Sequence, residues 1–209
     1  MKQGIIFDMD GTLWDSAIGV AKSWTMVVAE EYTKERVITE KDIQGVMGKT
    51  MDVIAEILFP ELAGEKREQL LQHCCEAENA YLREHGGILY EGLEDTLKAL
   101  KKSYHLYIVS NCQCGYIEAF LDYYKLWDYF EDIECYGNTG CKKGANIKLV
   151  VERNNLTKAV YVGDIQGDYD ASCEAGVEFI HAAYGFGTIN APVPAIHALP
   201  ELPEVMEQF

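Results

Sequence analysis

The sequence has few basic residues and no long apolar run, and each of these deficits argues against one class of binding partner. Across 209 residues, 18 Lys and Arg stand against 34 Asp and Glu, which gives a formal net charge of -16. This negative excess opposes general attraction to nucleic acid and to anionic membrane surfaces. Nothing approaches the roughly 20 uninterrupted apolar residues that a membrane-spanning helix needs. We therefore expect neither nucleic acid nor a membrane as a partner.

The chain also lacks a recognisable cysteine framework. It has seven cysteines, but Cys112 and Cys114 are separated by one residue, whereas zinc sites space paired cysteines by about two to four and need further ligands. Small, apolar side chains at the start of a helix explain this pair better. The apolar run after Lys2 is too short for a secretory signal. We therefore expect a reducing, cytoplasmic setting.

An acidic pair follows a short apolar strand near the amino terminus, in the segment Gly4–Thr12. Asp8 and Asp10 lie two residues apart, so in strand geometry they share a face, and their carboxylates repel unless a cation or a proton intervenes. Magnesium is the natural cation, since it prefers oxygen ligands and keeps waters that a phosphate can displace. Gly11 permits the sharp turn that follows.

Two further buried strands are expected, at about 104–109 and 159–162, and polar residues follow each. The candidate site residues at these ends are Ser110 and Asn111 after the first strand, and Asp164 and Asp168 after the second. Lys142 and Lys143 lie between the two strands, directly ahead of a helical stretch. Open parallel sheets bind ligands at the carboxyl ends of their strands, which is where these groups fall.

The chain between the first two strands is helical in pattern. Asp15 and Ser16 can cap a first helix, and further helical stretches are expected from Met51 to Pro60 and from Glu65 to His85. Beyond Gly92, apolar strands alternate with helices, as in right-handed crossover units. We therefore predict an α/β core with a doubly wound parallel sheet, made of residues 1–14 and 90–209, and a helical insert at 15–89.

Taken together, these residues resemble the four motifs of the haloacid dehalogenase superfamily. The matching positions, in chain order, are Asp8–Thr12, Ser110, Lys143, and Gly163–Asp164 with Asp168. In many members a proline follows the lysine of the third motif, whereas Gly144 follows Lys143 here, so Lys142 remains an alternative. The helical insert resembles the cap of the phosphoglycolate phosphatase and beta-phosphoglucomutase branch.

The resemblance implies a magnesium-dependent hydrolase of small phosphorylated metabolites. Asp8 would be the nucleophile that forms an aspartyl phosphate, and Asp10 the general acid and base. Magnesium would bind the Asp8 carboxylate, the Asp10 backbone carbonyl and Asp164, with Asp168 in the second coordination shell. Ser110, Asn111 and Lys143 would hold the phosphoryl oxygens. Lys49, in the cap segment Gly48–Thr50, either grips a second polar group of the substrate or is a solvated surface lysine.

Two other functions use the same residues. A phosphosugar mutase would return the phosphoryl group to a sugar, and a phospho-accepting signalling domain would keep it on Asp8. Asp10 and the long helical insert argue against signalling, because a durable acyl phosphate needs no general acid. The leaving group of the substrate stays open, because the fold alone does not determine it. A monomer is the default expectation for a capped domain of this size.

Overall fold

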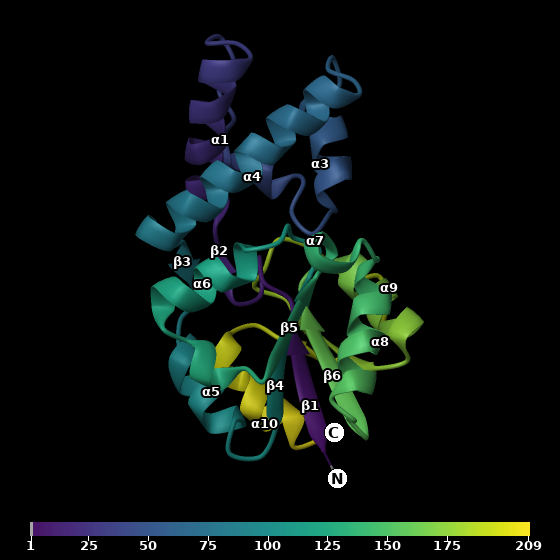
Figure 1. The fold of residues 1–209 in the computed structure, drawn as a ribbon. Coiled ribbons are helices and arrows are strands. Elements are labelled where there is room, and N and C mark those ends of the chain that lie inside the picture. Colours follow the sequence, from purple (N-terminus) through teal and green to yellow (C-terminus); the bar gives the residue numbers. More distant parts are fainter. Residues whose placement is uncertain (1) are drawn as a thin grey trace.

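A computed structural model describes residues 2–209, and its centre is a six-stranded sheet (Figure 1). The strands are β1 (Gln3–Phe7), β4 (His105–Ser110), β5 (Asp132–Cys135), β6 (Lys158–Gly163), β7 (Glu178–Ala182) and β8 (Ala195–Ile196). Their order across the sheet is β5-β4-β1-β6-β7-β8, and each neighbouring pair is parallel. The strands expected at 104–109 and 159–162 are confirmed to within one residue at each end, and the α/β doubly wound class is confirmed.

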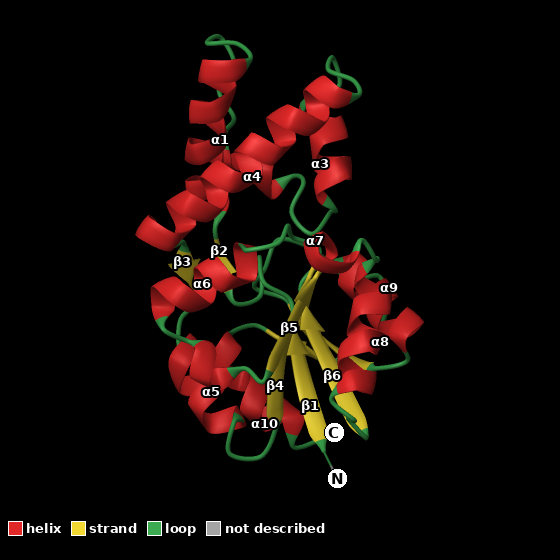
Figure 2. Cartoon of the chain, viewed as in Figure 1, coloured by secondary structure: helices red, strands yellow, loops and turns green. Residues whose placement is uncertain are grey.

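Helices cover both faces of the sheet (Figure 2). On one side lie α5 (Leu93–Leu100), α6 (Tyr116–Tyr124) and α10 (Leu202–Met206), and on the other lie α8 (Lys143–Arg153) and α9 (Gln166–Ala175). Successive side chains of β1 pack on opposite faces of the sheet. Ile5 and Phe7 belong to one buried apolar cluster, and Ile6 belongs to another. This alternation is the two-residue period of a strand, so continuous apolar strands fill both layers.

Shorter elements complete the core. They are the helix α7 (Tyr136–Thr139) and the 3-10 turns at Trp127–Tyr129 and Leu199–Glu201. Among residues 2–209, no helix has both the length and the apolar character needed to cross a membrane.

Four helices inserted after β1 form a separate module above the carboxyl edge of the sheet (Figure 1). They are α1 (Ala17–Glu31), α2 (Glu40–Gln44), α3 (Met51–Leu58) and α4 (Glu65–His85), and we call them the helical module. The α1 and α4 helices pack together, and the rings of Trp24 and Phe59 stack with their centroids 6.1 Å apart. The helical pattern of the sequence predicted α3 and α4 closely.

A two-stranded antiparallel sheet joins the helical module to the core. It pairs β2 (Trp14–Asp15) with β3 (Ile88–Leu89). The sequence analysis expected no strand here, because two residues are too few to show a two-residue period. Trp14 is fully buried, and its ring lies 5.6 Å from that of Tyr116 and 5.0 Å from that of Phe120, centroid to centroid. The connection is therefore anchored to α6 of the core.

Candidate active site

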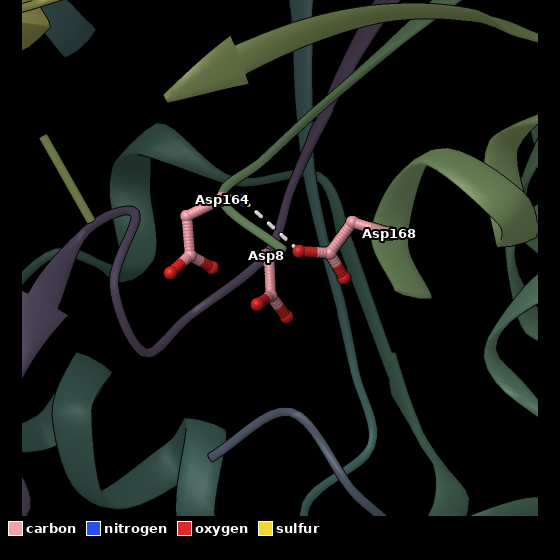
Figure 3. Close-up of side chains that lie close together, drawn as sticks. All are labelled: Asp8, Asp164 and Asp168. Atoms are coloured by element: carbon pink, nitrogen blue, oxygen red, sulfur yellow. Dashed lines mark hydrogen bonds between the residues drawn. The ribbon is translucent and has the colours of Figure 1, made fainter. Parts of the chain in front are cut away.

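Three carboxylates converge at the carboxyl edge of the sheet (Figure 3). Asp8 directly follows β1, Asp164 directly follows β6, and Asp168 lies in the first turn of α9. Their exposed fractions are 2%, 1% and 0%, and one oxygen from each lies within 4.8 Å of the others. The strands are adjacent in the sheet, so residues 156 positions apart in the chain meet at one edge.

A single lysine ammonium lies among these carboxylates. Lys143, the first residue of α8, is 4% exposed, and its Nζ donates to Asp8 Oδ1 at 2.8 Å and to Asp168 Oδ1 at 2.6 Å. Burial alone would lower the pKa of Lys143, but the two carboxylates outweigh it and raise that pKa. Lys142 precedes the helix and is exposed. Of the two lysines, the structure brings Lys143 to the cluster.

The cluster carries more negative than positive charge when its carboxyl groups are ionised. Burial, chiefly, raises the pKa of Asp8 to about 7 and that of Asp164 to about 8, with the neighbouring carboxylates adding to the shift. One ammonium group cannot balance three buried carboxylates. A cation held by oxygen ligands would, and the donor set is of the kind that magnesium prefers. The residues present therefore fit a divalent metal ion.

The two acidic residues beyond β6 have different capacities for a metal ion. Asp168 Oδ2 accepts the backbone N–H groups of Asp164 and Ile165 at 3.0 and 3.1 Å, and its Oδ1 accepts from Lys143. Both oxygens are thus engaged. Asp164 accepts one backbone N–H, from Phe186 at 2.7 Å on Oδ2, which leaves Oδ1 for a ligand. These contacts favour Asp164 as a direct ligand and Asp168 as the group that orients Lys143 and the loop.

The backbone around Asp164 leaves no room for side chains. Gly11 has φ +83°, and a Cβ there would lie 2.1 Å from Asp164 Oδ2. A Cβ on Gly185 would lie 2.4 Å from the Cβ of Asp164. Glycine is therefore required at both positions by close approach, and at Gly11 also by the left-handed backbone.

Asp10 lies beside the cluster and is held by two hydroxyl groups. Its Oδ1 accepts from Ser16 Oγ at 2.6 Å and from the Tyr116 hydroxyl at 2.7 Å. Burial raises the pKa of Asp10 to about 6, although these two hydrogen bonds oppose the shift. The sequence analysis expected Ser16 as a helix cap, but its side chain makes no cap bond and serves Asp10 instead. The capping contact comes from Asp15, whose Oδ1 accepts the Ala17 N–H at 2.9 Å.

The two residues expected after β4 differ in their surroundings. Ser110, the last residue of the strand, is buried and lines a cavity between the core and the helical module. Asn111 was expected to hold a phosphoryl oxygen, yet its Nδ2 donates to the backbone carbonyl of Gly48 in the helical module at 2.9 Å. Its Oδ1 is buried and has no hydrogen-bond partner within residues 2–209.

A cavity of about 40 Å³ lies between the helical module and the carboxyl edge of the sheet, with Asp10, Ser110 and Asn111 on the core side. It has room for a few water molecules and is too small for a phosphorylated metabolite. Lys49 lines the rim of the cavity and is exposed. This position is compatible both with a substrate contact and with a solvated surface lysine. We therefore expect the helical module to move when a substrate enters.

Four residues of this site were not identified from the sequence as site residues. Ser16, Glu78, Gln113 and Tyr116 lie on or beside the cavity through contacts between distant segments. Glu78 gave one signal, a charged residue inside a helical pattern, whereas Ser16 and Gln113 lie outside the helices, where no period marks a buried position. Such a signal does not separate a ligand contact from an internal hydrogen bond.

Comparisons with known proteins agree with this geometry. A model of the family "Haloacid dehalogenase-like hydrolase" matches residues 5–182. The phosphoglycolate phosphatase of Aquifex aeolicus is 29% identical over 199 residues, which covers 91% of this chain and 89% of that protein. The phosphoglycolate phosphatase of Vibrio vulnificus is 28% identical over 200 residues, covering 87% and 84% of the two chains.

Solved structures share the fold. A putative haloacid dehalogenase-like hydrolase from Bacteroides fragilis superposes with a TM-score of 0.83 at 24% identity, covering 97% of this chain and 100% of that one. CbbY from Rhodobacter sphaeroides, solved in complex with phosphate, gives a TM-score of 0.78 at 19% identity, covering 97% and 96%. Because the family match spans most of the chain, the chain belongs to the haloacid dehalogenase-like hydrolase family and is a phosphatase.

Proposed function

We propose that the protein is a magnesium-dependent phosphomonoester hydrolase that acts on a small phosphorylated metabolite through an aspartyl phosphate on Asp8. The observation that carries the proposal is the buried contact of Asp8 with Lys143, beside Asp164 and Asp168. A carboxylate that is buried at a strand end, next to an ammonium group and a metal-compatible cluster, is placed for phosphoryl transfer.

Charge neutralisation is the first requirement of this reaction, because the oxygens of a phosphomonoester repel an attacking carboxylate. The Asp8 and Asp164 carboxylates and the Asp10 backbone carbonyl would hold magnesium, with Asp168 in the second coordination shell. The ion, when bound, would polarise the phosphoryl group and offset its negative charge. Lys143 adds a fixed positive charge, and Ser110 and Asn111 would contribute polar contacts to the phosphoryl oxygens.

The covalent steps then follow from the positions of the two aspartates. An oxygen of Asp8 attacks phosphorus, and the bond from phosphorus to the leaving oxygen breaks. Asp10 gives its proton to that oxygen, and the contacts from Ser16 and Tyr116 keep its carboxyl group in place. Asp10 then takes a proton from the water that attacks the acyl phosphate. Inorganic phosphate leaves, and Asp8 is regenerated.

The helical module would act as the cap of this enzyme, with residues 15–89 over a core of 1–14 and 90–209. It closes over the catalytic edge and leaves little room for water, which protects the acyl phosphate between the two steps. Its lining residues contact the leaving group and so select the substrate. Lys49 is at the rim, where it can reach a polar group of the substrate.

The nucleophile assignment is tested with Asp8→Asn and an aryl phosphate in the presence of magnesium. Wild-type protein should release inorganic phosphate, and chelation of the metal should stop it. Asp8→Asn should abolish turnover with an unchanged far-UV circular dichroism spectrum, and the control Asp170→Asn, an exposed residue of α9, should retain it. Normal phosphate release by folded Asp8→Asn would refute the proposal.

The same measurement separates hydrolase from mutase. A hydrolase releases phosphate without a bisphosphate activator, whereas a mutase needs one and gives no net release. A panel of phosphorylated metabolites would then rank the substrates, with phosphoglycolate included because similar proteins are named phosphoglycolate phosphatase.

A further inference from the structure

A buried glutamate of the helical module faces the cavity. Glu78 of α4 is 4% exposed and lines the cavity together with Asp10 and Tyr116. Its Oε2 accepts the Trp24 indole N–H at 2.5 Å, and its Oε1 accepts the Gln113 amide at 3.0 Å. A carboxylate offers about four acceptor positions, so these two bonds orient the group and leave it further acceptor capacity.

Neither partner of Glu78 carries a charge, so its negative charge is not balanced by an ion pair at these contacts. Burial raises the pKa of Glu78 to about 7, and the nearby Asp10 carboxylate adds to the shift. A buried acid with neutral donors is stabilised by any further donor that approaches it, and most by a cationic one.

A second acceptor belongs to Asn111, which lines the same cavity. One of the two Asn111 amide N–H groups donates to the Gly48 carbonyl, which can only accept, and this fixes which side of the amide carries Oδ1. The buried Asn111 Oδ1 is therefore an acceptor without a partner among residues 2–209. Within the same described range, the lining holds one basic side chain, the exposed Lys49 at the rim.

The remaining wall is apolar and comes from the helical module. It includes Val20, Trp24, Ile43, Val46, Met51 and Ile54. The cavity as it stands is too small for a leaving group, so the relevant space is the one that forms here when the helical module moves. A leaving group held there would meet hydrocarbon on most sides and acceptors at the Glu78 and Asn111 positions. A carboxylate at the inner end would instead lie against the acceptors, and each such contact is repulsive or leaves a polar group unpaired.

We propose that Glu78 selects leaving groups with a short apolar body that ends in a hydrogen-bond donor, an amino or a hydroxyl group. This inference rests on the proposed phosphatase function and assigns the substrate class. It differs from a carboxylate-bearing substrate such as phosphoglycolate, for which Lys49 would have to be the main contact. Glu78 contacts the substrate in this proposal and takes no part in the covalent steps.

The test uses a matched set of alkyl phosphates with two to five carbons, each ending in a methyl, hydroxyl, ammonium or carboxylate group. Wild-type protein should show a kcat/KM for the best donor-ended ester at least about tenfold above the methyl-ended ester of equal length. Glu78→Gln should reduce this ratio about tenfold for ammonium-ended esters, because the charge that pairs with ammonium is lost. A preference for ammonium over hydroxyl, or the reverse, identifies which donor the natural substrate carries.

Two further variants keep the result interpretable. Glu76→Gln changes an exposed glutamate on the outer side of the same helix and should leave every ratio unchanged. Glu78→Asp keeps the charge but shortens the side chain, and it should shift the preferred ester to a longer one. A purely structural Glu78 would lower activity on all esters equally, which overturns the proposal.

Further measurements separate a failure of the substrate inference from a failure of the proposed function. A wild-type preference for carboxylate-ended esters that Lys49→Ala removes would also overturn the proposal. Methyl phosphate is a phosphomonoester whose leaving group cannot extend along the cavity, so it reports on the core chemistry alone. If wild-type protein hydrolyses neither methyl phosphate nor the aryl phosphate with magnesium, the proposed function fails. If it does, but Glu78→Gln leaves the ratios unchanged, only the substrate inference fails.

Discussion

The side-chain amide of Asn111 donates a hydrogen bond to the backbone carbonyl of Gly48, with 2.9 Å between nitrogen and oxygen. The contact joins the core, at the end of β4, to the loop of the helical module that follows α2. Gly48 has φ +79°, and a Cβ there would lie 2.3 Å from Ile165 Cδ1, so this loop seats closely on the core. The closed arrangement therefore depends on one residue that sequence reasoning assigned to phosphate binding.

Replacing this amide should loosen the helical module. Without substrate, Asn111→Ala should speed amide hydrogen exchange at residues 46–50 about fivefold, because loss of one hydrogen bond costs about 1 kcal/mol. Hydrogen exchange with mass spectrometry measures the change. Asn138→Ala removes an exposed core amide that bonds Glu134 and should leave that loop unaffected. Equal exchange in the two variants would contradict a role for Asn111 in closure.

The two adjacent lysines should differ sharply in their effect on activity. Lys143→Ala removes the ammonium between Asp8 and Asp168 and should lower kcat by at least about 100-fold, the usual cost of losing a buried charge partner of a phosphoryl group. Lys142→Ala alters an exposed residue at the start of the same helix and should stay within about twofold of wild type. Steady-state phosphate release measures both. A larger loss from Lys142→Ala would reverse the assignment.

Glycine at position 11 should be needed for space as well as for backbone conformation. Gly11→Ala forces a Cβ to within 2.1 Å of Asp164 Oδ2 and also strains a φ of +83°. Gly140→Ala imposes comparable strain at φ +67°, but no heavy atom lies within 4 Å of its Cβ. We expect Gly140→Ala to cost about 1 kcal/mol of unfolding free energy and Gly11→Ala clearly more. Urea denaturation compares them, and equal costs would show that Asp164 moves aside freely.

Glu78 should make folding stability depend on pH. Its pKa is about 7 in the folded protein against an ordinary 4.5, so the unfolded chain loses the proton first. Stability is then unaffected by this group below about pH 4.5, falls as pH rises toward 7 by up to about 1.4 kcal/mol per pH unit, and is level above that.

The difference between two proteins isolates this group, since other buried acids titrate in both. Unfolding free energies of wild type and Glu78→Gln are measured by urea denaturation at several pH values from 4.5 to 8. Wild type should lose stability relative to Glu78→Gln between pH 4.5 and 7. A constant difference across that range would show that Glu78 is already ionised when the protein is folded.

The sequence predicted those parts of the structure that depend on local pattern. Asp8 and Asp164 were found because each follows a continuous apolar strand, and parallel strands end at one edge. The helices α3 and α4 were predicted because helical spacing extends over several turns and ends at Pro60 and at Gly86.

What the sequence could not predict depends on contacts between distant segments. Tyr116 reaches Asp10 across 106 positions, and Gln113 reaches Glu78 across 35. No local period marks such pairs. Asn111 is a further example. The sequence placed it correctly after a strand, but its hydrogen-bond partner, Gly48, lies 63 positions away in the helical module and could not be predicted.

The ladder between β2 and β3 has a consequence for motion. The chain passes between core and helical module twice, at Trp14–Asp15 and at Ile88–Leu89, and the two crossings are hydrogen bonded to each other. We therefore expect the two crossings to bend together when the helical module moves, with the Trp14 ring packed against α6 at the core end. A movement that lifts the module from the core would also separate Asn111 from Gly48, so we expect opening to depend on residues outside the buried carboxylate cluster.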